Sequence, residues 1–204
     1  MIKFVLKEVC AIPRSLRYYF YLWFNRFYLK KNGVSLGMNF KVVNHVYFNV
    51  HETSQIVIGD NFMFTSSEAY NPLCRNIKGC VKVCKNAVLL IGNNVGISSA
   101  CIWVHKSIRI GNNVKIGGDC ILIDSDCHSL NYLERRDDNS DKLNKKDKEI
   151  VIEDDVLIGA RCIILKGVHV GARSVIGAGS VVTKDIPCDC IAAGNPCKVI
   201  KRFD

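Results

Sequence analysis

The amino-acid sequence predicts an all-β protein whose chain winds as a coil of short strands, and two observations support this prediction. A seven-residue phrase recurs, for example as I-G-N-N-V-G-I at 91–97 and as I-G-N-N-V-K-I at 110–116. Apolar residues also recur every six positions in long runs. The longest such run consists of Ile152, Ile158, Ile164, Val170, Ile176 and Val182.

A period of six residues differs from the periods of ordinary amphipathic elements. A surface helix needs apolar residues three and four positions apart, and a hairpin needs turn residues between alternating runs. A coil of short flat sides fits the period, because one apolar side chain per side points inward and Gly, Asn or Asp rounds each corner. Three sides make one turn, as from 152 to 170, and stacked turns bury a common core.

The chain divides into three regions. We expect residues 1–33 to form a basic and aromatic helical appendage that is broken near Pro13. We expect residues 34–187 to form the coil. Within it, residues 129–149 carry six basic and six acidic side chains and no repeat phrase, so we expect a long solvated loop there. Residues 188–204 lose the six-residue frame, and we expect them to cap the end of the coil.

Charge is concentrated at the N-terminus. The 204 residues carry a net charge of +9, of which residues 1–31 hold +6 and the remainder only +3. This distribution argues against a nucleic-acid partner for the coil. Two roles stay open for the aromatic, cationic N-terminus: peripheral contact with an anionic membrane, or packing on the coil as a lid or subunit contact.

Cysteine usage favours a reducing compartment. The eleven cysteines include no Cys-x2-Cys pair, so we expect small buried thiols and no bound metal. Charged residues Lys3, Lys7 and Glu8 interrupt any early apolar run, and no secretory signal is evident. We therefore expect a cytoplasmic protein, with the inner face of the membrane as a possible location.

The C-terminal part of the coil carries the most specific motif. The stretch I-G-A-G-S-V-V-T-K-D-I-P at 176–187, followed by A-A-G-N-P-C-K-V-I at 192–200, resembles the hexapeptide-repeat acyltransferases. The resemblance covers roughly residues 34–202. It is closest to sugar O-acetyltransferases, namely those for galactosides, maltose, capsule and lipopolysaccharide. It implies a left-handed parallel β-helix, a homotrimer and acetyl-CoA as the acyl donor; the handedness follows from the family alone.

The resemblance also implies a catalytic histidine. In the family this residue stands just before the protruding loop, and D-S-D-C-H-S-L at 124–130 places His128 there. A sugar hydroxyl must lose its proton as it attacks a thioester, and imidazole, with a pKa of about 6.5, suits the role of general base. On a strand, Asp126 shares a face with His128, so we expect this carboxylate to orient the ring or bind a hydroxyl.

Cofactor and acceptor contacts follow from the same resemblance. Small or polar residues near the C-terminal coils match positions that hold acetyl-CoA, and two lysines match positions that meet its phosphates. These residues are Ala160, Ala178, Thr183, Lys184, Lys198 and Lys201. We expect acceptor contacts from Ser98, Asp124, Tyr132 and Arg135. Leu157 stands where many relatives have Trp, and Ser98 and His105–Lys106 stand where galactoside enzymes have Asn and Asp, so we expect a different acceptor.

The sequence thus predicts transfer of an acetyl group to a sugar hydroxyl in the biosynthesis of a surface polysaccharide. An acetyltransferase for a small amine or antibiotic, and a non-catalytic scaffold on the same coil, remain alternatives. A metal-dependent lyase on this fold requires three converging histidines and a close H-x4-H pair. The nearest pair here, His45 and His51, is six residues apart.

Overall fold

The computed structural model describes residues 14–203, so the helix break expected near Pro13 lies outside the described residues. The chain forms three sheets, which we name A, B and C. Sheet A contains β1 (Ser35–Leu36), β4 (Gln55–Ile58), β7 (Val88–Ile91), β10 (Ser107–Ile110), β13 (Ile150–Ile152) and β16 (His169–Val170). Sheet B contains β2 (Lys41–Val43), β5 (Met63–Thr65), β8 (Gly96–Ser98), β11 (Lys115–Ile116), β14 (Leu157–Ile158), β17 (Val175–Ile176), β19 (Cys190–Ala193) and β20 (Lys198–Arg202). Sheet C contains β3 (Tyr47–Val50), β6 (Cys80–Val83), β9 (Cys101–Val104), β12 (Ile121–Ile123), β15 (Ile163–Leu165) and β18 (Val181–Val182).

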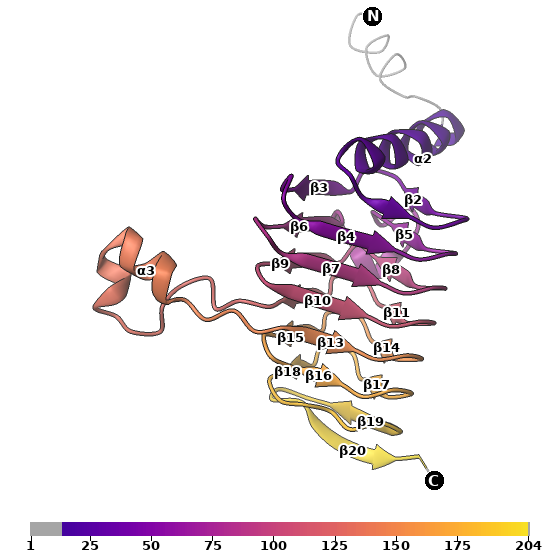
Figure 1. The fold of residues 1–204 in the computed structure, drawn as a ribbon. Coiled ribbons are helices and arrows are strands. Elements are labelled where there is room, and N and C mark those ends of the chain that lie inside the picture. Colours follow the sequence, from indigo (N-terminus) through magenta and orange to yellow (C-terminus); the bar gives the residue numbers. More distant parts are fainter. Residues whose placement is uncertain (1–13, 204) are drawn as a thin grey trace, which may run out of the picture.

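The chain visits the three sheets in rotation, as Figure 1 shows. Each strand from β1 to β15 pairs in parallel with a strand one turn later, for example Ile110 of β10 with Ile152 of β13. The predicted six-residue frame is confirmed: its inward positions Ile152, Ile158, Ile164, Val170, Ile176 and Val182 are each at most 1% exposed. Only β20 runs antiparallel, against β19, at the C-terminal end of the stack.

The corner between sheets A and B explains the repeated asparagines. Asn39, Asn61, Asn94 and Asn113 all have φ between 53° and 59°, the left-handed region that asparagine tolerates. The side-chain amide of Asn39 donates to Asn61, Asn61 to Asn94, and Asn94 to Asn113, over 2.9–3.0 Å. Asn113 donates to the carboxylate of Asp155 at 2.9 Å. We call these five residues the amide ladder. Its hydrogen bonds give the corner side chain of each of these turns a partner in the next turn.

Helix α2 (Arg14–Lys31) lies across the N-terminal end of the stack (Figure 1). The buried Asn25 donates from its side-chain amide to the carbonyls of Val42 and Asn44, at 3.2 and 3.0 Å. The Tyr28 hydroxyl donates to a backbone carbonyl of β3 at 3.2 Å, and Leu29 is 1% exposed within the core. One side of α2 thus closes the open end of the coil.

A long excursion leaves the coil between β12 and β13 and carries two short helices, η2 (Glu134–Arg136) and α3 (Asp138–Asn144). Neither helix contains a buried residue, and Figure 1 shows α3 standing well away from the stack. Backbone bonds join the two feet of the loop, because the Asp126 amide donates to the Lys146 carbonyl and the Lys148 amide to the Asp124 carbonyl. A second 3-10 helix, η1 (Pro72–Cys74), lies between β5 and β6.

Candidate active site

His128 lies where the chain leaves sheet C for the protruding loop. Its Nδ1 is 2.6 Å from Oδ2 of Asp141, the fourth residue of α3. Oδ1 of the same carboxylate accepts the backbone amide of Ser129 at 2.6 Å. Asp141 therefore fixes both the ring and the backbone next to it, while 70% of the His128 side chain stays exposed.

The hydrogen bond to Asp141 decides which nitrogen of His128 is free. A carboxylate only accepts hydrogen bonds, so Nδ1 of the neutral ring carries the proton and Nε2 keeps its lone pair. The same contact, and then the Ser129 amide, hold the pKa of Asp141 below its ordinary value. Asp141 thus stays ionised and can stabilise an imidazolium at position 128.

Asp126 does not orient His128 in this arrangement. Strand β12 ends at Ile123, and Cys127 has a φ of 62°, so residues 126 and 128 do not share a strand face as expected. The Asp126 carboxylate is 3.3 Å from Nζ of Lys166. The strand geometry assumed for Asp126 is corrected accordingly: its carboxylate is paired with a lysine, and Asp141 holds the ring.

Asp124 is buried and anchors the neighbouring corner of the coil. Its side chain accepts the backbone amides of His105, Lys106 and Ser107 at 2.6, 2.7 and 2.7 Å. Burial raises the pKa of this carboxyl, and the three amides oppose that rise. With no exposed surface, Asp124 cannot touch an acceptor directly, which corrects the expectation of a substrate contact.

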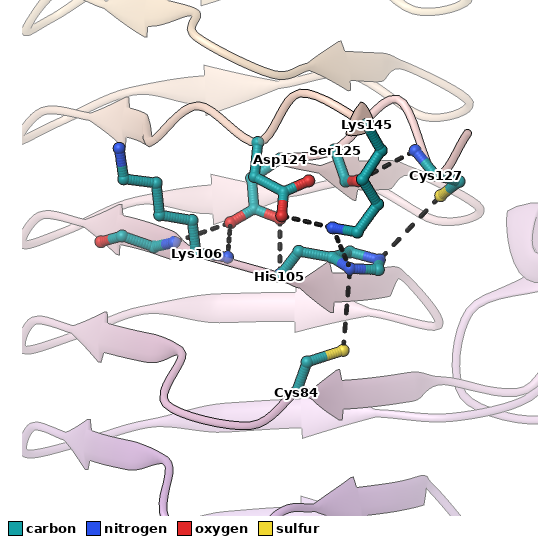
Figure 2. Close-up of polar contacts among 9 residues, drawn as sticks. Cys84, His105, Lys106, Asp124, Ser125, Cys127 and Lys145 are labelled. Atoms are coloured by element: carbon teal, nitrogen blue, oxygen red, sulfur yellow. Dashed lines mark hydrogen bonds and ion pairs between the residues drawn. The ribbon is translucent and has the colours of Figure 1, made fainter. Parts of the chain in front are cut away.

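His105 occupies the same corner one turn earlier, and Figure 2 shows it between two thiols. Its Nδ1 is 3.9 Å from Cys84 Sγ and 3.3 Å from Lys145 Nζ, and its Nε2 is 3.9 Å from Cys127 Sγ. Burial, and then the charge of Lys145, lower the pKa of His105. The cluster therefore holds a neutral imidazole that supports the residue before His128.

Ser98 lies away from His128 within one chain. It stands at the end of β8 in sheet B, where Thr65 donates to its hydroxyl at 3.3 Å. An open groove of about 500 Å³ crosses this face of sheet B, and Ser98 lines it together with Gly96, Lys115 and Leu157. A whole strand of sheet C separates this groove from the exit to the loop.

The two loop residues that we expect to contact an acceptor, Tyr132 and Arg135, follow His128 in the protruding loop. Tyr132 is 60% exposed, with the Arg136 guanidinium 5.4 Å from its ring centre. Arg135 is folded back, because its Nη1 donates to the Ser129 carbonyl at 2.6 Å. Tyr132 can therefore present a ring to a ligand, whereas Arg135 first serves to hold the loop.

The expected cofactor residues lie around the C-terminal turns. Ala160 and Ala178 are stacked at the corner between sheets B and C, where the Gly179 amide donates to the Ala160 carbonyl at 2.8 Å. At the same corner, a Cβ on Gly159 would stand 2.6 Å from the Ala178 nitrogen, so only glycine fits. The remaining positions are exposed, after β18 or on β20: Thr183, Lys184, Lys198 and Lys201.

Asp141 is the candidate site residue that sequence reasoning missed. It lies 13 residues beyond His128, within a charged loop that has no repeat, so nothing in the sequence distinguishes it from the other five acidic residues there. Within residues 14–203, no group of three His, Cys, Asp or Glu side chains is placed to hold a metal ion.

The chain is similar to known proteins that contain hexapeptide repeats. The family profile described as "Hexapeptide repeat of succinyl-transferase" matches residues 149–184. A stretch of 52 residues is 56% identical to 2,3,4,5-tetrahydropyridine-2,6-dicarboxylate N-acetyltransferase of Staphylococcus aureus (strain Newman). That match covers 26% of this chain and 22% of the relative, so the chain matches about a fifth of the length of this curated relative.

Two solved structures are similar to this protein over most of its chain. The polySia-specific acetyltransferase NeuO is 30% identical, with a TM-score of 0.54 over 83% of this chain and 75% of its own. A hexapeptide-repeat acetyltransferase of Vibrio cholerae O1 biovar eltor, solved with acetyl coenzyme A, is 27% identical, with a TM-score of 0.56 over 88% of this chain and 77% of its own. The coil, the repeat and these likenesses together show that the chain belongs to the hexapeptide-repeat acyltransferase family.

Proposed function

We propose that the protein is an acetyl-CoA-dependent O-acetyltransferase that modifies a sugar hydroxyl in the biosynthesis of a surface polysaccharide. The observation that carries this proposal is the exposed His128 ring, held at Nδ1 by Asp141 where the loop leaves the coil. Such a pair is suited to remove a proton from a bound alcohol. Acetyl-CoA as donor is supported by the Vibrio cholerae relative, which was solved with that molecule.

The reaction needs no acyl-enzyme, because the thioester is already activated. The acceptor hydroxyl gives its proton to Nε2 of His128 while its oxygen forms a bond to the acetyl carbonyl carbon. The tetrahedral intermediate then breaks its carbon–sulfur bond, and the proton passes from the imidazolium to the departing CoA thiolate. Asp141 stays ionised throughout and stabilises the charged ring.

We further propose that the site is shared between copies of the chain in a homotrimer, wound with the left hand of the family. The Ser98 groove lies on sheet B, whereas His128 follows β12 of sheet C, so a strand of sheet C lies between them in one chain. A second copy packed beside the first would bring its groove against the loop exit. Ser98 is then available to donate a hydrogen bond to the acetyl oxygen or to an acceptor hydroxyl.

In this proposal, the C-terminal turns of the coil bind acetyl-CoA. Small residues at Ala160 and Ala178 let a pantetheine arm approach the backbone, while Thr183 and Lys184 border the same turns. The exposed Lys198 and Lys201 on β20 supply point charges for the nucleotide phosphates. We place the reaction in the cytoplasm, where acetyl-CoA is available.

An amine acceptor is the second candidate, because the Staphylococcus aureus relative is an N-acetyltransferase. The two candidates differ in the acceptor alone, since both need a base and the same donor. Parallel assays with sugar and amine acceptors, each followed by release of free CoA thiol and by mass of the product, separate them. A product stable to mild alkali identifies an amide, whereas an ester is cleaved.

The decisive experiment compares His128→Ala with His169→Ala. His169 Nε2 is 2.8 Å from Oε1 of Glu153, which makes an exposed histidine–carboxylate pair of the same kind outside the site. We expect His128→Ala to lower kcat by about two to four decades with unchanged binding of acetyl-CoA in calorimetry, and His169→Ala to act like the parent. Full activity of His128→Ala would overturn the assignment. Absence of acetyl-CoA binding by the parent would instead indicate another acyl donor or a scaffold.

A further inference from the structure

Helix α2 has a second apolar side that the fold does not use. Asn25, Tyr28 and Leu29 face the coil, and the opposite side exposes a stripe of large side chains. With about 3.6 residues per turn, these residues fall on one face of the helix. The stripe consists of Leu16, Tyr19, Phe20, Trp23 and Phe27, each between 52% and 67% exposed.

The aromatic rings of the stripe are organised. Trp23 and Phe27 are stacked, with ring centres 5.3 Å apart and planes at 9°. Phe20 stacks on Phe24 at 5.6 Å. A contiguous, ordered aromatic surface of this kind costs free energy in water and marks an interaction site.

Basic side chains border the stripe. The helical period places Arg17 and Arg26 on opposite flanks of the stripe, and Lys30 and Lys31 form the last turn of α2. No acidic residue occurs between residues 13 and 51, and Glu68, which lines a hollow with Arg17, is the acidic side chain next to one flank, so α2 and the first turn of the coil carry a net positive charge. The partner of this end must therefore be apolar in part and anionic at its surface.

We propose that α2 docks this end of the protein on an anionic lipid bilayer. Tryptophan, tyrosine and phenylalanine suit the boundary between head groups and acyl chains, and flanking Arg and Lys side chains bind anionic head groups. Two like-charged ends repel each other, which disfavours a second copy of the chain as the occupant. No helix of residues 14–203 is long and apolar enough to cross a bilayer, so α2 lies in the surface.

The place of α2 sets the orientation of the docked protein. Because the helix lies across the end of the stack (Figure 1), the coil axis stands away from the membrane. His128 follows β12, the fourth strand of sheet C counted from that end. With about 4.8 Å between strands, β12 lies about 14 Å from β3 along the coil axis, and α2 lies beyond β3, so the ring stands more than about 14 Å from α2. A lipid-linked glycan of several units would span that height; this consequence rests on the proposed function, whereas the docking does not.

The test uses Trp23 as its own reporter. The chain has two tryptophans, so Trp103→Phe leaves Trp23 as the sole tryptophan, which excitation at about 295 nm selects over the tyrosines. On mixing with phosphatidylcholine vesicles that contain phosphatidylglycerol, we expect a blue shift of its emission and sedimentation of the protein with the vesicles. Phosphatidylcholine alone should bind it at least tenfold less, and added salt should weaken binding. An unshifted emission and an unbound protein would overturn the proposal.

Matched variants separate the two components of the surface. Lys30→Glu with Lys31→Glu should weaken vesicle binding at least about tenfold, whereas Lys85→Glu, in the turn after β6, should not. Trp23→Ala with Phe27→Ala should abolish sedimentation, whereas Met38→Ala, which removes a 70% exposed side chain outside the helix, should leave it intact. Circular dichroism checks that each variant is folded. The proposal is wrong if the parent does not bind vesicles and Trp23→Ala with Phe27→Ala only lowers the particle mass in light scattering. The stripe would then bind a second copy of the chain.

Discussion

At the scale of single residues, the proposed catalytic base is held by a contact that joins the coil to its loop. His128 stands on the coil side, and the carboxylate that holds it comes from α3. The same carboxylate accepts the Ser129 amide, so the ring cannot swing without breaking the turn that follows it. The orientation of the base is therefore a property of the folded loop.

Replacement of Asp141 by Asn tests this contact. The amide can donate to Nδ1 and so favour the tautomer with its proton on Nε2, which cannot accept the hydroxyl proton. We expect kcat to fall at least about tenfold while KM for acetyl-CoA is unchanged. Steady-state kinetics check the result, with Asp138→Asn in the same helix as the control. An equal fall of kcat in Asp141→Asn and Asp138→Asn would mean that the negative charge of the loop supports activity and that the Asp141–His128 contact does not.

His105 predicts how stability depends on pH. Its pKa is lowered by burial and by Lys145, against the opposing charges of Asp147 and Asp124 and with a further lowering by Lys82. The unfolded chain therefore takes up a proton at higher pH than the folded chain does. The free energy of unfolding should fall as the pH drops through the unfolded histidine value of about 6.5.

Urea unfolding of the parent and of His105→Gln over pH 5 to 8 measures this effect, and the variant should show the shallower slope between about pH 6.5 and 5. The Asp141 carboxylate, whose pKa is lowered, contributes stability that is lost only as the pH falls below its unfolded value of about 4. Its contribution therefore does not overlap with this window. Parallel curves for the parent and the variant would contradict the prediction.

At the scale of elements, the loop packs little against the coil, and the side-chain contacts His128–Asp141 and His105–Lys145 join the two near the feet of the loop. The loop adds no buried residue to the core in η2 or α3, and its feet are tied to each other by backbone hydrogen bonds beside Asp124 and Asp126. A short linker closes such an insertion at little entropic cost. The loop can therefore be removed without unfolding the coil.

Replacement of residues 130–144 by a short Gly-Ser linker should leave the thermal midpoint within a few degrees of the parent, because the buried core is unchanged and Lys145 keeps its contact with His105. Activity should fall at least as far as in Asp141→Asn, because Asp141 is lost. Thermal melting followed by circular dichroism and the CoA-release assay give the two readings. A large drop in the midpoint would show that the loop holds the coil together.

The sequence predicted the elements of the coil well and those of its excursions poorly. The inward Ile152 and Ile158 repeat with a fixed spacing, so each strand is specified by its own residues. The Asp141–His128 contact arises because the loop between β12 and β13 folds back on its first residues. Asp124 is buried because its corner of the coil lies on the corner formed by His105 one turn earlier. No local pattern encodes either relation, because partners 13 to 19 residues apart meet only in the folded chain.

At the scale of the whole molecule, the outer face of sheet C is unusually apolar. Cys80 and Cys101 face each other across neighbouring strands, and Ile121 and Ile163 continue the same row. Further along, Trp103 lies beneath the ammonium of Lys82 at 4.7 Å. This face lies between the Ser98 groove and His128, where a second copy would complete the proposed site.

The proposed trimer can be tested through this face. Light scattering should give three chains per particle for the parent and one for Ile121→Glu, because a charge in an apolar interface goes unpaired. Calorimetry should show that the monomeric variant has lost acetyl-CoA binding at least tenfold. Asn93→Glu, at an exposed corner, is the matched control. A monomeric parent with full activity would contradict the shared site.

The amide ladder gives the stack a direction. Every rung donates from its side-chain nitrogen towards the C-terminal end, and the series finishes on the negative charge of Asp155. Aligned amide dipoles polarise one another, so each rung is strengthened by the carboxylate at the far end. Loss of a middle rung such as Asn94 leaves one donor and one acceptor without partners, whereas loss of Asn39 leaves a single acceptor. Loss of Asn94 should therefore lower the free energy of unfolding more than loss of Asn39 does, which urea unfolding of Asn94→Ala and Asn39→Ala would measure.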